Sequence, residues 1–197
     1  MLSVRSLKRL HVSASFELHT GECIALQGPS GVGKTVLLRA IADLDPNEGF
    51  LLLDGIPREK VSAPRWRTQV TYVAAESGWW ADTVQEHFPK WEEASPLVEE
   101  FGMPSSCGDW QITRLSTGER QRLGLIRALI LRSRVLLLDE PTSALDTVSR
   151  EAVERIIAAW VAAGTSVIWS THDKAQARRV ASRMFIMSAG RVEEYAI

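Results

Sequence analysis

The stretch GPSGVGKT has the residue types and the spacing to hold the phosphates of a nucleotide. It fits the phosphate-binding loop pattern G-x-x-x-x-G-K-T, in which backbone N–H groups and a helix N-terminus surround an anion. The predicted binding residues are Gly28, Pro29, Ser30, Gly31, Val32, Gly33, Lys34 and Thr35. Lys34 is expected to reach the β- and γ-phosphates, and the Thr35 hydroxyl to bind Mg²⁺. The alternative is a glycine-rich turn that binds nothing, but all fixed positions of the pattern are filled.

Two acidic residues follow the apolar run VLLL in RVLLLDEPTSALD. Asp139 is predicted to hold Mg²⁺ through water, and Glu140 to orient or deprotonate the water that attacks the γ-phosphate. Taken alone, this segment would favour an ordinary strand that ends at a turn, because Asp-Glu-Pro breaks regular structure. The phosphate-binding loop upstream favours the catalytic interpretation.

A second anion-receptive surface is predicted at the helix start in LSTGERQR. Ser116 and Glu119 are spaced as a capping box, which is a sufficient structural reason for both residues. The same helix start carries Ser116 and Gly118, with Arg120 and Arg122 close behind, and helix N-termini attract phosphate. Since one phosphate-binding loop needs no second phosphate site, this surface indicates that two subunits share each nucleotide.

These motifs need a scaffold in which strands and helices alternate, and the chain has this pattern. Strands are expected at 23–28, 49–55, 70–74 and 134–140, and helices at 34–44, 117–132 and 147–164. Further strands are expected in TSVIWSTH and RMFIMSAGRVEE, separated by a helix in DKAQARRVAS. The strands are continuously apolar, which predicts an α/β fold whose mainly parallel sheet is buried on both faces. Between Ala81 and Arg114, Pro89, Pro96 and Pro104 are expected to break up regular structure.

Composition limits the class of protein and the compartment in which it is expected. A chain of 197 residues with 45% hydrophobic and 24% charged residues suits one compact domain, and a net charge of -1 gives no bulk reason to bind nucleic acid. Cys23 and Cys107 lie far apart and outside any C-x-x-C pattern, which fits a reducing cytosol. The N-terminus lacks the continuous apolar core of a secretory signal. The longest apolar stretch, 156–169, is interrupted at Gly164 and is too short to span a bilayer.

In combination, these motifs resemble the ATP-binding subunit of ABC transporters, whose signature usually reads LSGGQ, over essentially the whole chain. The phrases ADTV, RQRLGLIRAL, RVLLLDEPTSALD and STHDK are similar to short single-domain subunits related to the bacterial iron-export ATPase. The resemblance implies a P-loop NTPase fold of ABC type, with a mainly parallel core sheet, an antiparallel β part and a short helical subdomain. One domain, 1–197, would comprise a core at about 1–75 and 133–197 and a helical part at about 76–132.

The resemblance also implies an activity and partners. ATP, with Mg²⁺, would be bound between GPSGVGKT of one subunit and LSTGE of the other in a head-to-tail homodimer, and would be hydrolysed to ADP and phosphate. Asp146 would lie across the dimer interface, and His172 would be a switch histidine that contacts the γ-phosphate. A lone histidine after a strand would otherwise be a surface residue. The subunit would drive a multi-span membrane permease and lie on the cytoplasmic face of the cell membrane through that partner.

Three departures from the family pattern bear on activity. Ala75 stands where the family usually carries a glutamine that contacts Mg²⁺ and the attacking water, and Glu76 follows it as a possible substitute. The signature has Thr117 in place of a glycine and Glu119 in place of the usual glutamine. The segment before His11 holds no aromatic residue, so only His11 is available there to stack on adenine.

Trp79 and Trp80 occupy the place where the family has a pair of apolar residues, beside a groove that receives a coupling helix of the membrane protein. Neighbouring residues on an extended segment point to opposite sides, so one ring is expected to pack inward and one outward. The alternative is that both are core residues. Two alternative functions stay open: a non-hydrolysing ATP-dependent switch, which Ala75 and the altered signature would leave, and a soluble ABC ATPase that is not engaged in transport.

Overall fold

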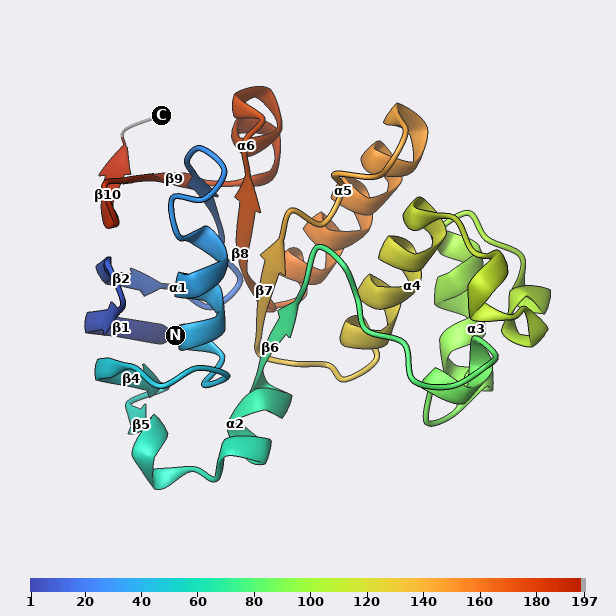
Figure 1. Cartoon of the computed structure of the whole chain (residues 1–197), viewed down its shortest axis with the longest axis horizontal. Helices are drawn as coiled ribbons and strands as arrows, with labels where there is room; N and C mark the ends of the chain where they lie inside the picture. Colours follow the sequence, from blue (N-terminus) through green and yellow to red (C-terminus); the bar gives the residue numbers. More distant parts are fainter. Residues whose placement is uncertain (196–197) are drawn as a thin grey trace.

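The computed structural model describes residues 1–195, which form one ten-stranded sheet with helices on both faces (Figure 1). The strands are β1 Leu2–Arg9, β2 Val12–Leu18, β3 Cys23–Gln27, β4 Glu48–Leu53, β5 Ile56–Pro57, β6 Val70–Val73, β7 Val135–Asp139, β8 Ser166–Thr171, β9 Arg183–Ser188 and β10 Arg191–Tyr195. The helices are α1 Lys34–Ile41, α2 Ala63–Gln69, α3 Trp91–Glu100, α4 Thr117–Leu129, α5 Thr147–Ala162 and α6 Lys174–Val180. No helix within this part of the chain has the length and apolar character to cross a membrane.

The sheet has a parallel part and an antiparallel part. Its strand order is β5-β4-β1-β2-β10-β9-β3-β8-β7-β6, and the strands from β9 to β6 pair in parallel. Strands β1, β2, β4 and β5 pair antiparallel. Every residue of β3, β7 and β8 is buried, as expected for parallel strands covered on both faces. The predicted α/β fold, with a mainly parallel core sheet and an antiparallel part, is confirmed.

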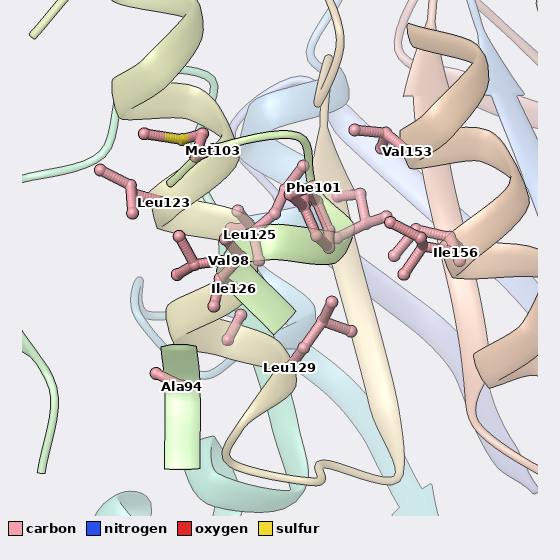
Figure 2. Packing of buried hydrophobic residues seen from close by; sticks show 14 of the residues in the cluster. Ala94, Val98, Phe101, Met103, Leu123, Leu125, Ile126, Leu129, Val153 and Ile156 are labelled. Atoms are coloured by element: carbon pink, nitrogen blue, oxygen red, sulfur yellow. The ribbon is translucent and has the colours of Figure 1, made fainter. Parts of the chain in front are cut away.

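Successive residues of β7 face two different hydrophobic cores. Val135 and Leu137 pack in a cluster with α1 and the antiparallel strands, whereas Leu136 and Leu138 pack with α3, α4 and α5. Figure 2 shows the second core, with its labelled residues Ala94, Val98, Phe101, Met103, Leu123, Leu125, Ile126, Leu129, Val153 and Ile156. Helices α1 and α4 therefore lie on opposite faces of the parallel strands.

Two expectations about the helices are wrong. Prolines do not break up the whole middle third, because α3 continues through Pro96. Proline has no N–H for the Glu92 carbonyl one turn earlier, and the Ser95 hydroxyl donates to that carbonyl at 3.5 Å instead. The helices expected at 34–44 and 117–132 end earlier, at Ile41 and Leu129, because the chain then turns through positive φ angles at Asp43 and Arg132.

Candidate functional site

The site lies where the parallel strands end. Strand β3 leads into the loop before α1, β7 ends at Asp139, and β8 ends just before His172. These strands are adjacent and parallel, so their carboxyl ends lie at one edge of the sheet. This is the edge at which open α/β sheets bind ligands.

The curled conformation of the predicted phosphate-binding loop depends on two glycine residues and on hydrogen bonds from Lys34. Gly31 and Gly33 have φ angles of 77° and 113°, in a region that favours glycine. The Lys34 ammonium donates to the Gly28 carbonyl at 2.8 Å and to the Pro29 carbonyl at 3.2 Å, and its side chain is only 5% exposed. The lysine thus stabilises the curled loop from inside, at the place where a phosphate would compete for it.

Asp139 is the polar centre of the site. This carboxylate is 4% exposed, and three neutral hydroxyl groups donate hydrogen bonds to it. Thr35 and Tyr72 donate to Oδ2 at 2.7 and 2.9 Å, and Ser170 donates to Oδ1 at 2.8 Å. Burial and the charge of Asp139 raise the pKa of Tyr72, which keeps its hydroxyl protonated as a donor. A buried carboxylate beside a threonine hydroxyl offers the hard oxygen ligands that Mg²⁺ prefers, so these residues fit the predicted metal.

Glu140 lies between two groups that could bear positive charge. Its Oε1 is 3.5 Å from the Lys34 ammonium, and its Oε2 is 3.5 Å from His172 Nδ1. The Glu140 side chain is 25% exposed and that of His172 is 65% exposed, so both can reach a bound ligand. The structure therefore brings together the predicted residues from three separate segments.

The predicted signature residues do not join this cluster. Ser116 and Glu119 form the expected capping box at the start of α4, with the Glu119 N–H donating to Ser116 Oγ at 3.2 Å. Helix α4 packs on the face of the sheet opposite α1 (Figure 1). A Cβ on Gly118 would lie 3.0 Å from the Ala144 carbonyl oxygen, so within one chain this glycine permits close packing against the loop after β7.

Known proteins are similar to this chain in sequence and in fold. The family model described as ABC transporter matches residues 12–143. The chain belongs to the ABC transporter family. It is 38% identical over 173 residues to the probable iron export ATP-binding protein FetA of Escherichia coli strain K12, covering 81% of this chain and 76% of FetA. It is 37% identical over 194 residues to the spermidine/putrescine import ATP-binding protein PotA of Chromobacterium violaceum, covering 91% of this chain but only 53% of PotA.

Solved structures of ABC ATPases show the same fold. An ATP-binding subunit of an ABC transporter superposes with a TM-score of 0.88 at 23% identity, covering all of this chain and 90% of that one. An ATP-binding cassette solved as a dimer bound to ADP and Pi superposes with a TM-score of 0.86 at 22% identity, covering 99% of this chain and 98% of that one. The predicted resemblance, fold class and ATPase class are confirmed, whereas the roles of individual site residues stay predictions.

The structure shows where the residues that depart from the family pattern lie in this ABC ATPase. Ala75 and Glu76 line a depression of about 220 Å³ together with Ser77, Thr117, Arg120 and Gln121. Glu76 is exposed there. His11 is also exposed, and a Cβ on Gly33 would lie 3.3 Å from its Nε2. The ring that is expected to stack on adenine therefore lies beside the start of α1.

The tryptophan pair of this ABC ATPase divides as predicted. Trp79 is partly buried against the core around α4, whereas Trp80 is 70% exposed. The Arg127 guanidinium lies 5.0 Å from the Trp79 ring centre and 4.8 Å from the Trp80 ring centre, and donates to the Gly78 carbonyl. Helix α4 thus holds the loop that presents Trp80.

Sequence reasoning missed Tyr72, Ser170 and Gln121. Tyr72 and Ser170 contact Asp139 from β6 and β8, and Gln121 contacts the Glu140 carbonyl from α4. Gln121 and Ser170 lie within the quoted phrases LSTGERQR and STHDK, but neither phrase assigns them a role as polar partners of the site, and Tyr72 lies in no motif. Only their positions could have suggested it, because Tyr72 and Ser170 stand near the carboxyl ends of parallel strands.

Proposed function

We propose that this ATPase powers a membrane transporter by hydrolysing ATP in a dimer that holds each nucleotide between two subunits. The hydrogen bond of 2.7 Å between the Thr35 hydroxyl and Asp139 Oδ2 carries the proposal, because it joins the phosphate-binding loop to a strand end 104 residues away. This is the arrangement that a nucleotide with a bound metal requires.

The chemistry follows from the positions of the side chains. The backbone N–H groups of residues 30–35 and the Lys34 ammonium bind the phosphates. Thr35 and Asp139 would hold Mg²⁺, and the bound ion would neutralise negative charge on the phosphates. A water molecule attacks the γ-phosphorus, its proton passes to the Glu140 carboxylate, and the bond to the ADP oxygen breaks. His172 contacts the γ-phosphate from the adjacent strand end.

The dimer is inferred from the place of the signature. Ser116 and Gly118 lie at the start of α4, which packs on the face of the sheet opposite the helix that follows the phosphate-binding loop. A second subunit in head-to-tail orientation supplies them to the nucleotide. Asp146 caps α5 by accepting from the Ser149 N–H at 2.9 Å, and this exposed corner is expected at the interface.

The membrane partner is a multi-span permease, which would hold this subunit on the inner face of the membrane. The exposed ring of Trp80 supports such a contact, because large aromatic side chains are common anchors in protein interfaces. The relatives are named for export of iron and for import of polyamines. Their names therefore agree on transport and differ in direction and substrate.

The test of hydrolysis is the substitution Glu140→Gln. It keeps the shape of the side chain and removes the base, so turnover is expected to fall by roughly 10²–10⁴-fold. ATP affinity is expected to persist, and an ATP-bound dimer to accumulate on gel filtration. Unchanged turnover would exclude Glu140 as the base.

Lys34→Ala tests the phosphate-binding loop separately. Removing the ammonium is expected to weaken ATP binding itself, measured by calorimetry, because the lysine is the side-chain cation of the loop. If ATP affinity were unaltered, the loop would not be the nucleotide site.

One observation favours a second candidate function, a non-hydrolysing ATP-dependent switch. Ala75 has no amide to position the attacking water, and the exposed Glu76 is the neighbouring polar group. Steady-state release of phosphate by the purified chain separates the two functions. Binding of ATP without turnover, in the unmodified protein, would favour the switch.

A further inference from the structure

Glu140 has an unusual backbone. Its φ angle is 46°, in the left-handed region that a residue with a Cβ adopts only when its surroundings hold it there. The Cα–Cβ direction, and with it the position of the carboxylate beside Lys34 and His172, depends on this conformation. The groups that fix the two peptide units of Glu140 therefore fix the carboxylate.

Side chains from two other elements bind these peptide units. The N–H of Glu140 donates to Ser170 Oγ on β8 at 3.0 Å. The carbonyl of Glu140 accepts from Gln121 Nε2 on α4 at 3.0 Å, and also from the Ser143 N–H at 3.2 Å. Ser170 also donates to Asp139, so its removal would disturb the metal site as well.

Gln121 is buried and hydrogen-bonded beside the backbone of Glu140. The residue is 4% exposed, and its Nε2 also lies 3.3 Å from Ser143 Oγ and 3.4 Å from the Ala75 carbonyl. Its Oε1 accepts from the Ala144 N–H at 3.1 Å. The carboxamide thus contacts the loop after β7 on both sides of Pro141. Among its acceptors, the Glu140 carbonyl is at the shortest distance.

We propose that Gln121 is a positioning residue for Glu140, which holds the left-handed backbone and so directs the carboxylate toward the attacking water. The proposal rests on the proposed role of Glu140 as the base. A side chain of α4, the helix that begins at the signature, then sets the geometry of hydrolysis in its own subunit.

The test replaces Gln121 with Met and, separately, with Glu. Met keeps the length of the side chain without hydrogen bonds, and Glu keeps its shape but presents an oxygen to the Glu140 carbonyl. We expect kcat to fall by roughly 10- to 100-fold in each of these two variants that folds, because small displacements of catalytic groups have effects of this size. The KM for ATP and the calorimetric affinity are expected to stay within about threefold, because Gln121 does not contact the phosphate-binding loop.

Ser133→Ala is the matched control. Ser133 is buried at the opposite edge of the sheet, where its hydroxyl pairs with that of Thr71 at 2.6 Å. Losing this buried hydrogen bond is expected to lower the melting temperature and leave kcat unchanged. If Gln121→Met behaved in the same way, Gln121 would be a structural residue only and the proposal would fail.

A double variant decides whether Gln121 acts through Glu140. In single-turnover assays, Gln121→Met is expected to lower the rate in the presence of Glu140 and to have little further effect beside Glu140→Gln, because residues that act as a unit are not additive. An equal loss in both backgrounds would overturn the proposal. If Glu140→Gln alone turned over at the normal rate, the proposed function would fail instead, so the two failures are distinguishable.

Discussion

Gly33→Ala is expected to destabilise the protein through two separable effects. Gly33 has a φ of 113°, and an alanine in the left-handed half of the map costs about 1–2 kcal/mol. An added Cβ would also lie 2.5 Å from Val12 Cγ2, well inside the ordinary carbon contact of about 3.5–4.0 Å. Crowding of this kind costs about 1–3 kcal/mol, which gives a total of roughly 2–5 kcal/mol.

Gly31→Ala is the matched control within the same loop. Gly31 also has a positive φ, of 77°, but a Cβ there would meet no heavy atom within 4 Å. Only the backbone effect of about 1–2 kcal/mol is expected. Thermal melting measures both variants, since each 1 kcal/mol shifts the melting temperature by about 2–4 °C in a domain of this size. The Gly31 variant should melt roughly 2–8 °C lower and the Gly33 variant roughly 4–20 °C lower.

Val12→Ala tests the crowding directly. It removes the methyl group that the new Cβ would meet. The double variant should therefore lose less free energy of unfolding, by about 1–3 kcal/mol, than the losses of Gly33→Ala and Val12→Ala added together. Additivity within about 0.5 kcal/mol would refute the contact between β2 and the phosphate-binding loop. Equal destabilisation by alanine at Gly31 and Gly33 would refute it as well.

Three further substitutions test the tryptophan pair and the departure at position 75. Trp80→Ala is expected to abolish co-purification with a co-expressed permease and to lower the melting temperature by only a few degrees, because the ring is 70% exposed. Trp79→Ala should cost about 3 kcal/mol, because its ring packs on the core. Early melting of both variants, or normal partner binding by both, would contradict this assignment. Ala75→Gln is expected to raise steady-state ATPase activity if the missing amide limits the positioning of water, and an unchanged or lower rate would mean that another residue supplies that function.

Much of the fold and site could be predicted because motifs and apolar strands coincide. The phosphate-binding loop directly follows the buried apolar strand β3, and the Asp139–Glu140 pair stands at the end of the buried strand β7, so local sequence predicts both the element and the chemistry. Strand β1 shows the opposite case. Its alternation is interrupted by a bulge between Val4 and Leu7, with a positive φ at Ser6, so buried and exposed positions lose the period of two.

The partners of the site could not be predicted, because tertiary contacts alone define them. Tyr72 lies 67 positions from Asp139 in the sequence, and Ser170 lies 31 positions away. Each has the ordinary pattern of a strand residue, and only the order of β6, β7 and β8 in the sheet directs their hydroxyl groups to one carboxylate. Gln121 stands within a helix whose other buried residues are mostly apolar, so its polar role depends on the loop packed against it.

Two of the departures are connected in space, although they are far apart in the sequence. Ala75 and Thr117 line the same depression, and Gln121 lines it as well and donates to the Ala75 carbonyl. The small side chain at Ala75 leaves this space open beside the start of α4, where Thr117 adds bulk that the family pattern lacks. A glutamine at position 75 would enter a depression of about 220 Å³ and not the packed core. The fold should therefore tolerate Ala75→Gln, and any change in its turnover reports on the added amide.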